Sequence, residues 1–387
     1  MMRIPWMMAL LLSLVVIGGC WDRREVNDMA IVIAMAMDKE PNGSYRLSVQ
    51  VPLVSNLGGP SGGGGGGKSG GKSFYVDSAV GTTIREANNT IQSRMSRHLY
   101  YAHHRVVVIG EKLAKEGFSD ALDIVSRFPE NRLTAYIVMT KGRAIDLLNA
   151  EPQFERFSGE AIREIVKSES IPVTIKDISQ MLNTPGVDAF LPIFAAVDTH
   201  PKGKSKELES VGIGTFRKDK LIATYTNYEM AGLRWFHRTE PLTMNVNLGP
   251  KKILSISFQN ARAKVNPSFA GGHIHFNIEV HGSAYVTENH SSLDLSQEVN
   301  SKLLEDKLSQ QIKNDVKKVM EQIKQTKSDT IGLGIVLARN FPKEWKEKYR
   351  STWDKEIPKI TYQIKSKVQV VDIGQTTKNI MKEEDHS

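Results

Sequence analysis

Two segments near the start of the chain show two different hydrophobic patterns. Met29 to Met37 is an unbroken apolar run, which is typical of a buried strand. Tyr45 to Val51 (YRLSVQV) alternates apolar and polar side chains with a period of two, as a half-buried strand does. Pro41, Asn42 and Gly43 lie between the two segments and favour a turn. The pattern therefore predicts a pair of strands joined by a short turn.

Helical spacing then alternates with short apolar runs as far as residue 150. Ile84, Ala87, Ile91 and Met95 predict an amphipathic helix over 82–96. The remaining predicted elements of this region are strands at 105–109 and 134–140 and helices at 119–128 and 142–148. This alternation predicts a mixed α/β layer, and two more helices, at 157–166 and 175–182, predict a small helical subdomain within 151–195.

A polar, basic stretch over 199–209 (THPKGKSKELE) predicts a linker or an exposed hairpin, and with it a domain boundary near residue 200. The pattern beyond it is mostly one of strands, at 211–216, 221–226, 244–248, 254–259, 273–280 and 360–371. One continuous apolar stripe runs through 295–324 and predicts a long helix lying across those strands. Its members are Val299, Leu303, Leu304, Leu308, Ile312, Val316, Val319 and Ile323.

The sequence thus predicts an α+β protein of two or three domains. We expect a mixed α/β N-terminal domain over 20–200, a C-terminal domain over 201–375 in which the long helix packs on an antiparallel sheet, and a polar tail over 376–387. The 387 residues suit that number of domains, and 40% hydrophobic with 24% charged residues is the composition of a folded protein. Trp345, Tyr349 and Trp353 have the spacing of one short helix, whose aromatic stripe is either core packing, the simpler interpretation, or an interface.

The first twenty residues have the layout of a signal peptide. Arg3 provides a positive charge, and an apolar run from Trp6 to Ile17, too short to span a bilayer comfortably, ends at Gly18, Gly19 and Cys20. The ending IGGC resembles a bacterial lipobox, so we expect cleavage between Gly19 and Cys20 and lipidation of Cys20, the only cysteine of the chain. Two acyl chains would suffice for stable membrane anchoring. The alternative is a plain signal peptide followed by a chance cysteine.

The stretch from Gly58 to Ser73 (GGPSGGGGGGKSGGKS) fits the phosphate-binding pattern G-x-x-x-x-G-K-[ST] twice, ending at Lys68–Ser69 and at Lys72–Ser73. A working phosphate loop opens directly into a helix, whereas the residues after Ser73 look extended. Polyglycine also matches this pattern in several registers by composition alone. We therefore interpret 58–73 as a flexible hairpin loop and expect no nucleotide binding.

Histidines give the best metal candidate. His273, His275 and His281 share one face of a predicted strand with Asn277 and Glu279, and a His-x-His pair can bind zinc. Apolar side chains fill the other face, so the polar face is equally well explained as the solvent-facing side of an antiparallel sheet. We therefore assign no metal. His103 and His104 are neighbours that would point opposite ways in a strand, so they do not suggest a shared metal.

Charge and motifs narrow the classes of function. The net charge of +8 comes without a dense basic block, so we expect no nucleic-acid partner. The sequence contains no G-x-S-x-G, H-E-x-x-H or C-x-x-C motif, and we expect neither an enzyme nor a cofactor.

The residues after the lipobox carry a family resemblance. Cys20, Trp21, Asp22, Arg24, Glu25, Val26 and Asn27 match the opening of the Ger(x)C spore-germination lipoproteins. Two later stretches, 212–236 and 328–374, resemble the carboxyl-terminal half of that family. The shared features of the second stretch are Asp329, Gly332, Gly334, Pro342, Trp345 and Trp353. The glycine run is a departure from the family pattern.

The resemblance implies the C subunit of a spore nutrient germinant receptor, a palmitate-type lipoprotein on the outer face of the spore inner membrane. Its implied partners are integral membrane A- and B-type subunits, and the anchor would raise its effective concentration near them. The alternative is a solute-binding lipoprotein of a transporter, although such proteins usually have two parallel α/β lobes.

Overall fold

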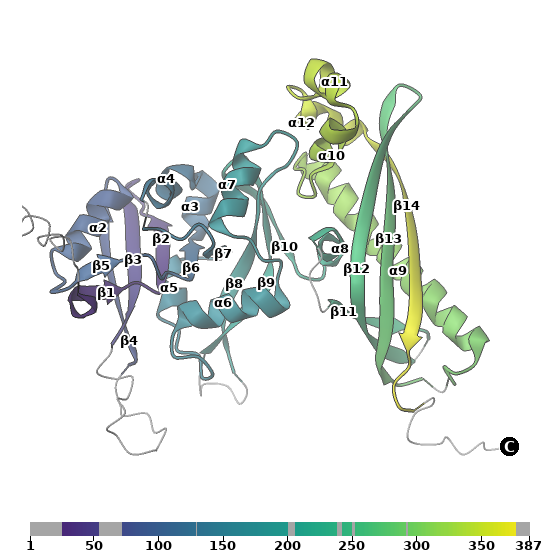
Figure 1. The fold of residues 1–387 in the computed structure, drawn as a ribbon, viewed down its shortest axis with the longest axis horizontal. Coiled ribbons are helices and arrows are strands. Elements are labelled where there is room, and N and C mark those ends of the chain that lie inside the picture. Colours follow the sequence, from purple (N-terminus) through teal and green to yellow (C-terminus); the bar gives the residue numbers. More distant parts are fainter. Residues whose placement is uncertain are drawn as a thin grey trace, which may run out of the picture.

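The computed structural model describes residues 25–53, 72–128, 130–199, 206–237, 242–249, 252–291 and 293–376. Figure 1 shows two parts side by side. The N-terminal half is a sheet with helices on both faces, and the C-terminal half is a sheet of long strands with one long helix along it. The predicted α+β architecture is confirmed.

The N-terminal sheet has, within the described residues, eight strands in the order β10-β9-β8-β7-β6-β2-β3-β4. Its strands are β2 (Ala34–Lys39), β3 (Tyr45–Pro52), β4 (Phe74–Gly81), β6 (Val106–Ile109), β7 (Tyr136–Thr140), β8 (Phe190–Asp198), β9 (Lys206–Arg217) and β10 (Lys220–Thr226). The four central strands are parallel, and antiparallel strands extend the sheet at both edges. Central parallel strands need apolar side chains on both faces, which explains the unbroken apolar runs of the sequence.

Strand β2 shows how helices cover both faces of this sheet. Met35 and Met37 lie in one hydrophobic cluster, and Ala34 and Ala36 lie in another, because side chains alternate across a strand. The first cluster includes α2 (Ile84–Gln92), α3 (Glu111–Glu116), α4 (Ser119–Arg127) and α7 (Ile175–Asn183); the second includes α5 (Ala144–Leu148) and α6 (Ser158–Glu169). The helices α6 and α7 therefore pack into the cores of the sheet, and residues 151–195 do not form a separate helical subdomain.

The apolar run at 29–37 forms two strands instead of the single one predicted. The 3-10 helix η1 (Val26–Asp28) leads into β1 (Met29–Ile31), which pairs in parallel with β5 (His98–Tyr100). The chain then crosses to β2 through Val32 and Ile33, whose N–H groups donate to the carbonyls of Tyr100 and Gln50, each at 2.9 Å. An apolar run does not reveal this crossing, because its residues are apolar in both sheets.

The large sheet crosses the boundary expected near residue 200. Strands β8 and β9 pair antiparallel, starting at Asp198 and Lys206. The predicted hairpin at 211–226 is confirmed as β9 and β10, with Lys218 in the turn at a φ of +54°. This hairpin belongs to the N-terminal sheet, not to the C-terminal one, because β9 continues the pairing begun by β8.

The C-terminal half is built on four described strands in the order β11-β12-β13-β14. They are β11 (Leu242–Asn247), β12 (Ile253–Ala270), β13 (His273–Asn289) and β14 (Thr361–Asp372), preceded by η3 (Ala231–Leu233) and α8 (Arg234–His237). The first three are antiparallel as predicted, but β14 pairs in parallel with β13. A parallel neighbour requires a crossover, which the helices between β13 and β14 provide.

The predicted long helix is α9 (Glu298–Thr326). Six members of its predicted stripe are buried, whereas Val299 is 78% exposed and Leu303 is 41% exposed, so the stripe begins to pack only after the first turn. The single helix predicted through Trp345, Tyr349 and Trp353 is wrong. That region consists of α10 (Leu333–Asn340), α11 (Pro342–Glu344), a π-helical turn η4 (Trp345–Tyr349), α12 (Trp353–Glu356) and η5 (Ile357–Lys359). All three aromatic residues are buried, which confirms core packing.

Candidate functional site

Asp329 lies at the contact between the two halves. This fully buried carboxylate accepts hydrogen bonds from the N–H groups of Leu333 (2.9 Å) and Gly334 (2.8 Å) and from the indole N–H of Trp353 (3.0 Å). It thereby satisfies donors at the start of α10, where a negative charge is favourable. Burial raises the pKa of Asp329 to about 6, against the opposing effect of these hydrogen bonds. The conformation of this segment is therefore fixed by one charged side chain.

Two glycines let the backbones of the halves touch beside Asp329. Gly186, in the loop between α7 and β8, has a φ of +96°, and a Cβ there would lie 2.7 Å from the carbonyl carbon of Gly334. A Cβ on Gly334 would lie 2.4 Å from the Cα of Gly186 and 2.8 Å from the Trp345 ring. Real Cβ atoms do not approach so closely, so both positions require glycine.

Hydrogen bonds hold this joint together. Between Asp188 and Asp329, the N–H of Asp188 donates to the Asp329 carbonyl (2.8 Å), and the N–H of Asp329 donates to the Asp188 carboxylate (2.7 Å). The N–H of Ile335 donates to the Gly186 carbonyl at 3.1 Å. Burial lowers the pKa of His237, which lies against the Thr330 carbonyl, to about 4, so this ring is neutral. At this joint the two halves therefore meet in a hydrogen-bonded backbone contact.

Next to the joint lies a cavity of about 330 Å³. It lies between the end of α7 and the segment around α12, and its lining includes Arg217, Lys218, Lys327 and Arg350. The carboxylates of Asp188 and Asp354 line the same space and offset part of this positive charge.

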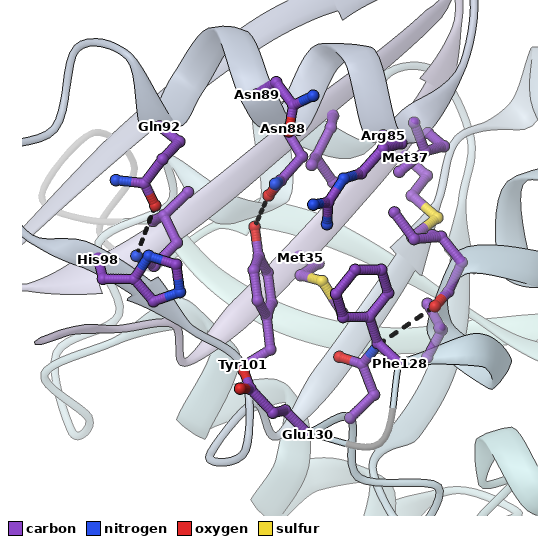
Figure 2. Close-up of a pocket in the computed structure, with 16 residues that line it drawn as sticks. Met35, Met37, Arg85, Asn88, Asn89, Gln92, His98, Tyr101, Phe128 and Glu130 are labelled. Carbon is purple, nitrogen blue, oxygen red and sulfur yellow. Dashed lines mark hydrogen bonds between the residues drawn. The ribbon is translucent and has the colours of Figure 1, made fainter. Parts of the chain in front are cut away.

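A second cavity, of about 270 Å³, lies inside the N-terminal half (Figure 2). Its apolar floor is formed by Met35 and Met37 of β2 and Leu47 of β3. One wall is α2, the opposite wall is the end of α4 with the residues after it, and β5 closes one end. The two helices are thus held apart over the sheet, and the space between them reaches the core.

Polar side chains of α2 line this second cavity. Arg85, Asn88, Asn89 and Gln92 recur at i, i+3, i+4 and i+7 and therefore share one side of the helix. The Tyr101 hydroxyl donates to the Asn88 side-chain oxygen at 2.5 Å, and burial raises the pKa of Tyr101, so the hydroxyl keeps its proton. Figure 2 shows this contact beside Phe128.

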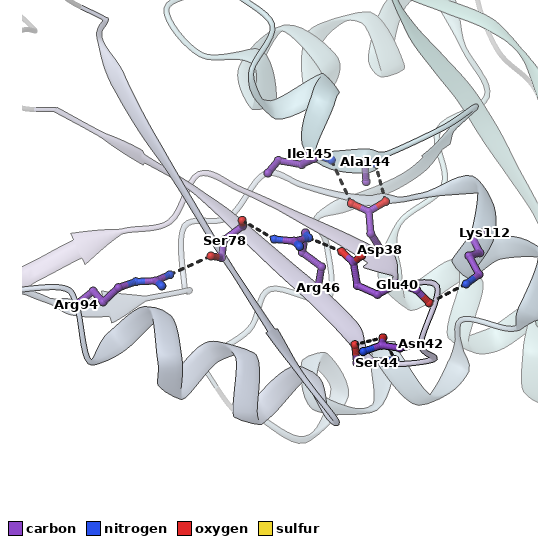
Figure 3. A network of polar contacts seen from close by, with 10 residues as sticks. All are labelled: Asp38, Glu40, Asn42, Ser44, Arg46, Ser78, Arg94, Lys112, Ala144 and Ile145. Atoms are coloured by element: carbon purple, nitrogen blue, oxygen red, sulfur yellow. Dashed lines mark hydrogen bonds and ion pairs between the residues drawn. The ribbon is translucent and has the colours of Figure 1, made fainter.

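A polar network connects the edge of the sheet to α5 (Figure 3). The Asp38 carboxylate accepts from the N–H groups of Ala144 (2.7 Å) and Ile145 (3.3 Å), at the start of α5, and burial raises its pKa. The neighbouring Glu40 forms an ion pair with Arg46 at 2.5 Å. Both carboxylates already have partners, so the network positions elements and does not form a reactive site.

The expected lipidation site, Cys20, and the cleavage point after Gly19 lie outside the described residues, as do Lys68 and Ser69 of the first glycine-loop match. The second match ends within them. Ser73 donates to the Arg156 carbonyl at 2.7 Å and leads directly into strand β4, which pairs with β3. A strand follows this match at the point where a phosphate loop would open into a helix. Strands β3 and β4 pair antiparallel, as the strands of a hairpin do, while residues 58–71 of the interpreted loop lie outside the described residues.

The histidines predicted to share a face of one strand do so on β13, where their side alternates with buried apolar residues. His275 lies 2.8 Å from the Thr361 hydroxyl of β14. Among the described residues, no cluster of three or more His, Cys, Asp and Glu side chains could hold a metal ion. His104 is fully buried against the Tyr101 carbonyl at 2.6 Å, and burial lowers its pKa.

The cavity beside α2 is absent from the predictions made on sequence. A signal was present, because the polar stripe of this helix carries Asn88 and Asn89, whereas exposed helix positions usually carry strong helix formers such as Lys, Glu and Gln. Both asparagines line the cavity.

Both halves of the chain match families of spore-germination proteins. Residues 22–196 match the family described as spore germination protein N-terminal domain, and residues 211–374 match the family described as spore germination B3/GerAC like, C-terminal. The chain belongs to this GerAC-like family, as its resemblance to the Ger(x)C lipoproteins predicts. The family is not one of known enzymes.

Individual relatives agree with the family. The chain is 35% identical over 363 residues to YfkR of Bacillus subtilis (strain 168), whose name assigns it to spore germination; this covers 91% of this chain and 94% of YfkR. It is 27% identical to spore germination protein KC of the same organism, over 94% of each. The crystal structure of the GerBC protein superposes with a TM-score of 0.57 at 18% identity, covering 87% of this chain and 96% of that one, and shares its fold.

Within the part of the chain that the structure describes, no helix is both long and apolar enough to cross a membrane. The family match gives no support to the alternative of a solute-binding lipoprotein of a transporter.

Proposed function

We propose that this chain is the lipid-anchored C subunit of a nutrient germinant receptor in the spore. The observation that carries the proposal is the match of two germination-protein families over 22–196 and 211–374, directly behind a lipobox that ends at Cys20. Cleavage after Gly19 and acylation of Cys20, with palmitate among the acyl chains, would hold the protein on the outer face of the inner membrane. Two acyl chains are enough for stable anchoring.

The proposed mechanism is interaction and not catalysis. The anchor confines the protein to the membrane plane, where integral membrane A- and B-type subunits would be its partners, at a raised effective concentration. The joint around Asp329 supports this role, because a rigid connection lets both halves contact partners as one body. Neither nucleotide nor nucleic acid has a role in this proposal.

Two experiments test the parts of this proposal separately. Incorporation of a clickable palmitate analogue should label the wild-type protein and leave Cys20→Ala unlabelled, whereas equal labelling of both would refute the anchor. Affinity purification of the protein from detergent-solubilised spore membranes should recover A- and B-type subunits. Cys20→Ala should recover less of them, and the exposed variant Val26→Ala is the matched control. Recovery of neither subunit with the wild type would refute the proposed partners.

A further inference from the structure

The long helix α9 covers only one face of the C-terminal sheet. Figure 1 shows α9 lying along one side of β12, β13 and β14. The even-numbered side chains of β14 face this helix, because the Lys324 ammonium of α9 lies over the Tyr362 ring, 5.9 Å from its centroid. Side chains alternate along a strand, so the odd-numbered ones from Thr361 to Gln369 point the other way, and they are exposed. The sheet therefore has an open face.

The strand register brings four cationic side chains together on this open face. They are Arg262 and Lys264 of β12 and Lys365 and Lys367 of β14, which we call the basic band. Between the two pairs lies β13, where Glu279 pairs with both Lys264 and Lys365, and His281 pairs with the other two. Neighbouring strands are about 4.8 Å apart, so the band spans about 10 Å across the sheet.

The charge of the basic band is largely uncompensated. All four cations are exposed, and among the described residues none of them has an ion-pair or hydrogen-bond partner for its side chain. The single carboxylate within the band, Glu279, offsets only one of the four charges. The sequence does not show this concentration of charge, because 262–264 and 365–367 are distant segments and neither is a dense basic block.

Polar side chains surround the basic band on the open face. They are Gln259, Asn266 and Ser268 of β12, His275, Asn277 and Ser283 of β13, and Thr361, Gln363 and Gln369 of β14. The centre of a protein–protein interface is instead depleted of charged residues and enriched in aromatic ones. Lipid headgroups need no apolar centre, and guanidinium and ammonium groups bind their phosphates. This composition favours an anionic membrane surface over a protein partner.

We propose that this open face binds the anionic headgroups of the membrane that holds the proposed anchor. The choice of the membrane rests on the proposed function, whereas the charge of the face does not. Figure 1 places β1, close to the first described residues, and the C-terminal sheet at opposite ends of the molecule. Attachment at both ends lays the long axis along the membrane. Two acyl chains are enough for stable anchoring, so the basic band sets the orientation of the protein.

Co-sedimentation with lipid vesicles tests the open face separately from the anchor. The chain from Trp21 onward contains every described residue and lacks the acylation site. We expect it to sediment with phosphatidylcholine vesicles that contain about one third phosphatidylglycerol, and to be released at about 0.5 M salt, where screening weakens charge attraction. It should stay in solution with phosphatidylcholine alone. Equal binding to both vesicles, or binding to neither, overturns the proposal, and binding to neither leaves an acidic protein surface as the occupant.

Paired substitutions locate the binding. Lys365→Gln with Lys367→Gln should weaken binding to the anionic vesicles about 25-fold, because each cation near such a surface contributes about five-fold. Lys302→Gln with Lys307→Gln is the matched control, since both lysines are exposed on α9, which covers the other face, and the net charge changes equally. An equal loss in the two double variants, or no loss in the first, overturns the proposal.

The vesicle experiment and the labelling of Cys20 fail independently. Vesicle binding uses a chain without the anchor, and palmitate labelling does not require the basic band. Labelling of Cys20 without vesicle binding would therefore overturn the membrane contact of the open face and leave the anchor in place. Vesicle binding without labelling would support the open face and refute the anchor.

Discussion

Replacement of Gly186 by alanine tests whether the backbone contact at the joint holds the halves together. The new Cβ would lie 2.7 Å from the carbonyl carbon of Gly334 and 2.9 Å from the N atom of Ile335. These are backbone atoms, so no rotamer change relieves the overlap, and overpacking of this kind costs about 1–3 kcal/mol. The positive φ of +96° adds about 1–2 kcal/mol for any residue with a Cβ. Together the free energy of unfolding should fall by about 2–5 kcal/mol.

Gly142 provides a matched control, because it has the same φ of +96° and a Cβ added to it would meet no atom within 4 Å. Gly142→Ala should therefore lose only the conformational part, about 1–2 kcal/mol. Urea denaturation followed by tryptophan fluorescence measures both variants, and Trp345 and Trp353 report directly from the joint, where their rings lie 5.4 Å apart. Equal destabilisation by the two substitutions would refute the reasoning, because it would show that contact between the halves contributes nothing.

Three further predictions concern stability. Because burial raises the pKa of Asp329 to about 6, the contribution of this group to stability is present at acid pH and is lost as the pH rises through about 6. Asp329→Asn should remove this part of the pH dependence of the free energy of unfolding, measured by urea denaturation at pH 4.5 and 7.5. An unchanged pH dependence would contradict the raised pKa of Asp329. Leu308→Ala, at a fully buried site of α9, should lower the free energy of unfolding by about 2–5 kcal/mol. Leu303→Ala, at a site 41% exposed, should lower it by less than about 1 kcal/mol. Similar values for the two variants would show that α9 does not pack as described. Thr174→Ala removes the side-chain cap of α7, which accepts from the Asp177 N–H at 3.2 Å, and should cost about 0.5–2 kcal/mol by thermal unfolding; no change would contradict the cap.

Periodicity in the sequence predicted most elements of the fold. The helix expected at 82–96 is α2 over Ile84–Gln92, and the strand expected at 105–109 is β6 over Val106–Ile109. The pairing of strands that are distant in the sequence is harder to predict from periodicity. The polar stretch 199–209 predicts a linker or an exposed hairpin, and the hairpin is the correct alternative, because Asp198 at the end of β8 pairs with Lys206 at the start of β9. Of the first five residues of β9, from Lys206 to Ser210, only Leu208 is apolar, so hydrophobicity does not distinguish this end of the strand from a linker.

Aromatic spacing misled for a related reason. Trp345, Tyr349 and Trp353 satisfy the spacing of one helix, but a π-helical turn and a break at 350–352 separate them. All three side chains are nevertheless buried, so the predicted core packing holds although the single helix does not. The sequence pattern does not predict the cavity beside α2. The apolar stripe of α2 shows only which side of the helix packs on the sheet, and a space between α2 and α4 becomes visible only when the positions of both helices are known.

The structure shows what the residues that carry the family resemblance in 328–374 do physically. Asp329, Gly334 and Trp353 lie in the stretch that resembles the carboxyl-terminal half of the family, and the structure brings them together at one contact.

Germination of spores that lack this protein tests the central proposal most directly. Loss of optical density would be followed after addition of a panel of nutrients and, separately, of a cationic surfactant that bypasses nutrient receptors. We predict that particular nutrients no longer trigger germination while the surfactant response stays intact, and that a wild-type copy restores the response. Unchanged germination with every nutrient of the panel would contradict the proposed receptor role.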